Sequence, residues 1–157
     1  MHEITLTINK AHVYDEVAKV TSYAGKKMTG EEGAYERIFT TDEDRQVLER
    51  FWIEACNAAT EQFKQFIESV SSQPESRDID LTRDYVVVLS LSSAFDVALA
   101  DGMQSSLFSY FVSYIAGRWF KFTNKAEAES YGADALGMMG DVVRKLWHRK
   151  KPTRVQI

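Results

Sequence analysis

Residues 84–91, with the sequence DYVVVLSL, form the most strand-like stretch of the chain. Their β-branched side chains favour a pleated surface over a helix. Residues 3–8, with the sequence EITLTI, alternate between polar and aliphatic side chains, which is the period-two pattern of a half-buried strand. Because unpaired strand edges are costly and neither strand has another evident partner, we expect these two strands to pair with each other.

A helical pattern follows the first strand. Asn9 is a good N-cap, and the apolar positions from Val13 onward follow helical spacing as far as Gly25, a natural stop. Residues 25–41 then contain three glycines, whose spacing matches neither a P-loop nor a dinucleotide-binding fingerprint. We therefore interpret residues 25–41 as a surface loop.

A second helix is predicted from a capping box, in which Thr40 is the N-cap and Glu43 reaches back to it. An apolar stripe from Leu48 to Val70 continues from this start with helical spacing. The stripe predicts one helix of about 30 residues that ends near Ser71.

The second half of the chain contains two further helical patterns, at about residues 95–122 and 124–149. Asn124 and Glu127 form a second capping box where the two helices meet. The sequence therefore predicts a mainly α fold, a four-helix bundle-like single domain with a small two-stranded β element in the order β-α-α-β-α-α.

The last two helices are expected to pack against each other through small residues, which let helix backbones approach closely. The opposite side of the third helix is apolar and should be buried. The small-residue face is Ser105, Ser109, Ser113 and Gly117, facing Gly132, Leu136, Gly140 and Val143, and the apolar side is Leu107, Phe108, Phe111, Tyr114, Ile115 and Trp119.

Charge is distributed unevenly along the 157 residues. The last 14 residues contain six Lys and Arg and no acid, which leaves 13 basic against 23 acidic residues in positions 1–143. The body therefore has a net charge of 13 − 23 = −10 and the end one of +6, an asymmetry typical of an interaction tail. We divide the chain into a helical domain, residues 1–150, and a basic extended arm, residues 151–157.

Three interpretations of the basic end remain open. Its cations complement the dipole of a helix C-terminus, or neutralise nucleic-acid phosphates. Alternatively, the chain after Pro152 docks on a neighbour as an extended arm, attracted by the acidic body. The candidate interaction residues are Arg144, Lys145, Trp147, Arg149, Lys150, Lys151 and Arg154.

The sequence has no strong motif for a catalytic, metal-binding or cofactor-binding site. Cys56 lies within a helical apolar pattern, where a packed thiol is expected, and a single cysteine forms no intramolecular disulfide. His2, His12 and His148 stand at no ligand spacing to one another. We therefore assign no catalytic, metal-binding or cofactor-binding residue, and expect no cofactor.

Asp96 and Asp101 interrupt an apolar region and are the acids of greatest interest. One interpretation is a catalytic pair. The other, which we favour, is a first-turn acid at position 96 and a solvated one at position 101.

No transport or membrane segment is predicted. The N-terminus lacks the basic and apolar regions of a signal peptide. The longest uncharged stretch, residues 102–117, is too short and too polar to span a bilayer comfortably. We expect a cytoplasmic protein, or one that enters a virion after assembly, with no membrane partner.

Three segments resemble small bacteriophage and prophage head–tail connector (neck) proteins. Residues 41–56 look like the acidic-capped second helix of those proteins, and residues 106–120 are similar to their second long helix. Residues 149–154, RKKPTR, resemble the basic tails of prophage structural proteins. The resemblance implies a non-enzymatic protein that forms a ring between portal and tail through head-to-tail contacts.

The sequence leads to two main hypotheses about the function of this chain. The first is a structural or assembly protein, a phage or prophage head–tail connector or neck component, which forms homo-oligomers and contacts portal and tail proteins. The alternative is a nucleic-acid-binding or regulatory helical module that uses the basic C-terminus, although the acidic body would repel a polyanion. An enzyme ranks third.

Overall fold

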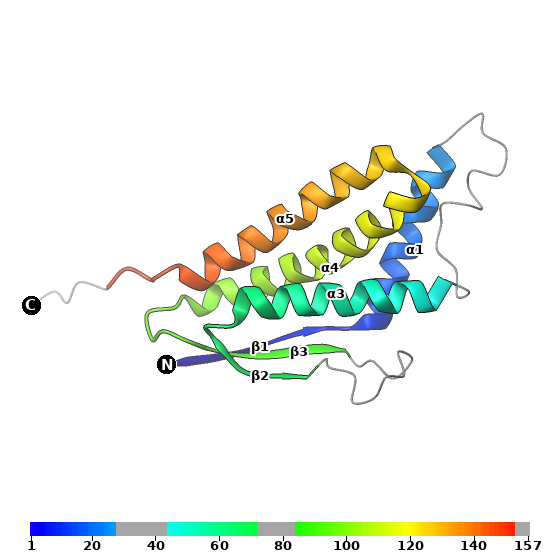
Figure 1. Cartoon of the computed structure of the whole chain (residues 1–157). Coiled ribbons are helices and arrows are strands. Elements are labelled where there is room, and N and C mark those ends of the chain that lie inside the picture. Colours follow the sequence, from blue (N-terminus) through cyan, green and yellow to red (C-terminus); the bar gives the residue numbers. More distant parts are fainter. Residues whose placement is uncertain (28–43, 72–83, 153–157) are drawn as a thin grey trace, which may run out of the picture.

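The computed structural model describes residues 1–27, 44–71 and 84–152. They form a mainly helical single domain with four helices and a three-stranded antiparallel sheet (Figure 1). A short 3-10 helix, η3, precedes the last two helices. In chain order the elements are β1 (His2–Ile8), α1 (Lys10–Lys27), α3 (Arg45–Phe63), β2 (Ile67–Ser71), β3 (Tyr85–Leu91), η3 (Val97–Leu99), α4 (Ala100–Thr123) and α5 (Lys125–Trp147).

The two predicted strands pair with each other as expected. β1 and β3 are antiparallel, with Ile4 opposite Leu89 and Leu6 opposite Val87. Alternate residues of both strands are buried, and the helices lie against one face of the sheet (Figure 1). The period-two pattern therefore predicted β1 and its buried face, and the β-branched run predicted β3.

The predicted two-stranded element was wrong, because β2 adds a third strand. α3 ends at Phe63 instead of continuing to Ser71, and β2 pairs antiparallel with β3 in the sheet order β1-β3-β2. The spacing of Phe63, Phe66, Ile67 and Val70 is compatible with a helix. The second edge of β3, however, supplies backbone partners that a helix would leave unused.

The helix boundaries agree with the predictions in part. His12 N donates to Asn9 Oδ1 at 2.9 Å, which confirms the cap of α1, but this helix continues past Gly25 to Lys27. The predicted capping box at Thr40 and the greater part of the predicted loop lie outside the described residues.

The second capping box was wrong. Asn124 occupies the N-cap position of α5, but among the described residues its side chain makes no capping hydrogen bond. The backbone carbonyl of Asn124 instead accepts from Glu127 N at 3.1 Å. This is the ordinary first bond of a helix, so the first turn of α5 begins without the predicted side-chain cap.

Close packing of α4 on α5 follows the prediction at one point. A Cβ atom on Gly117 would lie only 3.3 Å from the backbone nitrogen of Gly132, so these helices meet where both residues lack a side chain. Leu107, Phe111 and Ile115 on the other side of α4 are fully buried. Among the described residues, no helix has the length and apolar character needed to cross a membrane.

The side chain of Gln104 on α4 pairs with the backbone at the outer edge of β1. Its Oε1 accepts from Thr7 N at 2.9 Å, and its Nε2 donates to Thr7 O. We expect Gln104→Ala to lower the free energy of unfolding by about 1 kcal/mol, because two partly exposed hydrogen bonds are lost. Urea unfolding would measure the change, and Gln104→Glu, which keeps the acceptor and loses the donor, should fall between alanine and wild type. An unchanged midpoint for Gln104→Ala would contradict this role.

Candidate functional site

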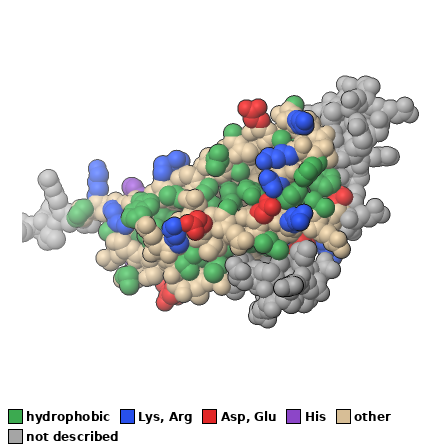
Figure 2. All heavy atoms as spheres, viewed as in Figure 1, with side chains coloured by type: hydrophobic (Ala, Val, Ile, Leu, Met, Phe, Trp, Pro, Cys, Tyr) green, Lys and Arg blue, Asp and Glu red, His purple; other side chains and the backbone are tan. Residues whose placement is uncertain are grey.

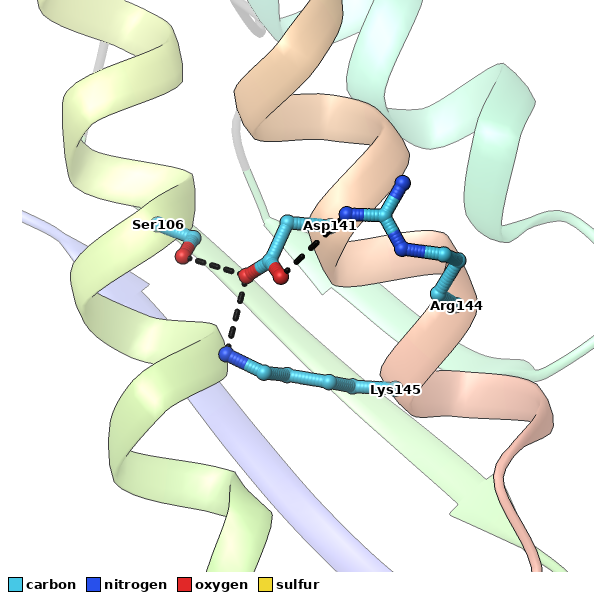
Figure 3. Close-up of polar contacts among 4 residues, drawn as sticks. All are labelled: Ser106, Asp141, Arg144 and Lys145. Atoms are coloured by element: carbon cyan, nitrogen blue, oxygen red, sulfur yellow. Dashed lines mark hydrogen bonds and ion pairs between the residues drawn. The ribbon is translucent and has the colours of Figure 1, made fainter.

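The first predicted interaction residues, Arg144 and Lys145, lie in the last turn of α5 and converge on Asp141 (Figure 3). Lys145 Nζ is 2.8 Å from Asp141 Oδ2, and Arg144 Nη2 is 3.5 Å from Oδ1. Ser106 on α4 donates to the same carboxylate at 2.7 Å. The cluster therefore joins α5 to α4 and serves the packing of the two helices.

The electrostatics of this cluster follow from its hydrogen bonds. Donation by Lys145 and by Ser106 lowers the pKa of Asp141, with further lowering by the charges of Lys145 and Arg144. Asp141 therefore stays ionised and offsets part of the positive charge at the end of α5. The interpretation of these cations as complements to a helix C-terminus agrees with their place in the last turn.

The chain beyond α5 continues in an extended form beside the segment that leads into η3. Arg149 Nη1 donates to the carbonyls of Leu146 and His148, at 3.1 and 3.3 Å. Lys150 N donates to Ala94 O at 2.7 Å, and residue 149 forms an isolated β-bridge with Phe95. These contacts hold the chain up to residue 150 against the segment that leads into η3.

The seven predicted residues therefore divide into separate groups. Arg144 and Lys145 meet at Asp141, whereas the Arg149 guanidinium lies 5.9 Å from the centre of the Trp147 ring. The side chains of Lys150 and Lys151 are exposed, and Arg154 lies outside the described residues.

The candidate chemical residues have structural roles. Asp96 Oδ1 accepts from Ala98 N at 3.1 Å and caps η3, while Asp101 is exposed in the first turn of α4. Asp101 is solvated as interpreted, but the interpretation of Asp96 as a first-turn acid was wrong: Asp96 is the N-cap of η3, and the acid in the first turn of α4 is Asp101. Cys56 is buried, and no group of three potential ligands for a metal ion occurs within the described part of the chain.

The sequence interpretation missed an open groove between α3 and α5, with α4 as its floor. We call it the α3–α5 groove. It encloses about 300 Å³, and hydrophobic side chains run along this face of the molecule (Figure 2). Its lining residues are Ala58 and Gln62 of α3, Tyr110, Tyr114, Gly117, Arg118 and Lys121 of α4, and Ala128, Gly132, Ala135, Leu136 and Met139 of α5.

A second hollow continues the groove past Gln62 toward the end of α5. Phe66, Val143 and Trp147 line it together with polar residues of α3. Trp147 packs edge-on against Phe66, with ring centres 4.9 Å apart. Phe66 follows the end of α3 at Phe63, so the segment between α3 and β2 contributes to this hollow.

Large apolar side chains are exposed around the groove. The side chain of Leu136, which lines it, is 77% exposed, and that of Trp147 is 53% exposed. Phe122, also 77% exposed, stacks on Phe51 with ring centres 6.3 Å apart. Single exposed apolar residues are common, but Leu136 and Trp147 both line one concave surface, which indicates an interaction surface.

The polar groups of the groove gather at the end of α4. Arg118 Nε lies 3.2 Å from Glu54 Oε2, and Tyr114 donates to the same carboxylate oxygen at 3.4 Å. Burial, and then the charge of Glu54, raises the pKa of Tyr114, so the phenol stays protonated and remains a donor. Lys121, one turn further along α4, is exposed and has no acidic partner among the described residues.

The groove left a partial signal in the sequence. The small-residue pattern of α4 and α5 was noted and interpreted as a packing face, although Gly117 alone fits that role closely and Gly132 also borders open space. The contribution of α3 left no such signal, because which face of α3 turns toward α5 depends on the tertiary packing.

Comparison with protein-family models, with curated proteins and with solved structures found no match for this chain.

Proposed function

We propose that this chain is a non-enzymatic assembly protein, a phage or prophage head–tail connector or neck component that forms oligomers. The observation that supports this role best is the α3–α5 groove, an open apolar surface bordered by exposed Leu136 and Trp147. A surface of this kind loses apolar exposure when another chain covers it, which favours association.

A structural role is also supported by the use of the polar residues. Asp96 caps a helix, Asp141 joins two helices, and Tyr85 is buried with its hydroxyl 3.1 Å from Thr60 Oγ1. Each of these groups is engaged by a neighbour within the fold. The connector role itself comes from the resemblance of residues 41–56, 106–120 and 149–154, and the acidic body with its basic end suits contacts between copies.

Light scattering on the purified chain over a dilution series tests this proposal. We expect oligomers that grow with concentration and are lost when residues 153–157 are deleted. This deletion preserves the hydrogen bond from Lys150 to Ala94, so the domain should fold as before. A full-length chain that stays monomeric at every concentration would overturn the self-assembling role.

Nucleic-acid binding is the second candidate, favoured by the exposed side chains of Arg144, Lys150 and Lys151. Asp141 offsets part of this charge, however, and the acidic body repels a polyanion. We therefore place it second.

A further inference from the structure

The α3–α5 groove has the length of a helical binding site. The residues that α5 contributes to its two hollows extend from Ala128 to Trp147. At 1.5 Å per residue this wall is roughly 28 Å long, about five helical turns. The wider part of this channel is mainly apolar, and the second hollow has both polar and apolar lining residues. A channel of this length and character matches the helix-in-groove mode of recognition, in which the apolar face of an amphipathic helix lies between two other helices.

The walls of the groove leave room for a backbone to approach. Ala58, Gly117, Ala128, Gly132 and Ala135 all line its wider part. A Cβ atom added to Gly132 would have no neighbour within 4 Å, so the space above this residue is open. Small side chains of this kind let a packed helix come close to its neighbours.

Within the described part of the chain, the charged side chains that line the groove are paired except at one end. Arg118 pairs with Glu54, and Lys64 pairs with Glu61 at 2.5 Å. Lys121 lines the groove without an acidic partner among the described residues. A ligand that complements this surface therefore carries a carboxylate at the end of the groove formed by the last turns of α4.

We propose that the α3–α5 groove binds an amphipathic helix of a partner protein, with its apolar face between α3 and α5 and an acidic residue opposite Lys121. This inference rests on the proposed assembly function and specifies the partner that the surface takes.

A display library of amphipathic helical peptides, with leucines fixed at helical spacing and the other positions randomised, tests this inference. Selection on the purified protein should enrich peptides with Asp or Glu at one end. Lys121→Glu should reverse that preference toward Lys or Arg, because the sign of the unpaired charge changes. Failure to select any binder, or selected peptides with no charge preference, would overturn the proposal.

Two glycines of α5 supply a matched pair of variants. Gly132 lines the groove and Gly137 does not, yet a Cβ atom at either position meets nothing within 4 Å. Gly132→Leu should fill the groove and weaken the selected peptides on the order of tenfold or more, whereas Gly137→Leu should leave their affinity unchanged. Both variants replace a helical glycine by a better helix former and should fold, which circular dichroism would check. Equal affinity for both variants would overturn the groove as the site.

Light scattering of the Gly132→Leu variant separates this inference from the proposed function. Oligomers that persist while peptide binding is lost would support both proposals. Oligomers that disappear with Gly132→Leu but persist with Gly137→Leu would show that a second copy occupies the groove, and would overturn the partner helix. Selected peptides that bind a strictly monomeric chain would support the groove and overturn self-assembly.

Discussion

Glu49→Ala is expected to lower the free energy of unfolding by about 3–5 kcal/mol, because it removes one partner of a buried ion pair. Glu49 is 1% exposed, and its Oε1 lies 2.7 Å from Lys10 Nζ, which is 17% exposed. Without the Glu49 carboxylate, the Lys10 ammonium group loses this counter-ion, and little solvent can reach it as a replacement. The pair also connects the start of α1 to α3, so the docking of α1 should weaken as well.

Chemical denaturation of two further variants tests this explanation. A Lys10→Met, Glu49→Leu double variant should recover most of the lost stability, because apolar residues of similar volume replace a buried pair at little cost. Glu61→Ala removes a carboxylate of α3 from an exposed pair with Lys64 and should change the stability by no more than about 1 kcal/mol. A double variant as unstable as Glu49→Ala would show that the ion pair is not the cause.

Trp52→Ala is expected to cost about 3–5 kcal/mol, the usual range for truncating a fully buried aromatic residue. Trp52 is fully buried on α3, its ring centre 4.9 Å from that of Phe111 on α4 and 6.4 Å from that of Tyr14 on α1. Truncation therefore opens a cavity where three helices meet. Thermal unfolding followed by circular dichroism would measure the loss.

Trp52→Phe provides the matched control. The indole nitrogen of Trp52 is buried and has no hydrogen-bond partner among the described residues. Phenylalanine keeps an aromatic ring in contact with Phe111 and removes a donor that is desolvated without compensation. We expect Trp52→Phe to lose much less stability than Trp52→Ala. Similar losses for both would indicate that the indole makes a polar contact on which the core depends.

The predictable part of the fold is the part with a clear local pattern. The alternation of β1 and the β-branched run of β3 identified both strands, because side chains point to opposite faces with period two. Asn9 identified the start of α1, because its side chain satisfies a free backbone donor of the first turn. Local patterns also placed α4 and α5, but the predicted start of the third helix at about residue 95 was wrong: Phe95 lies in an isolated β-bridge, and α4 begins at Ala100 after η3.

The candidate site was predicted less well. The charge of the sequence was enough to find the basic end. Which of its residues contact Asp141 and which contact the end of α5 depends on how α5 packs on α4. The α3–α5 groove needs residues from three helices that are distant in the sequence. Glu49 was not anticipated as a buried residue, since its burial depends on Lys10 of another helix.

Local sequence patterns are enough to predict the pairing of β1 with β3, the presence of four helices and the charge difference between body and end. These features follow from periodicity and composition, which act over a few neighbouring residues. The tertiary structure decided that the pattern after Phe63 becomes β2 rather than more helix, because β3 offers an edge whose backbone groups need partners. It also decided that three helices leave an apolar groove between them, because side chains from distant segments meet only when the chain is packed.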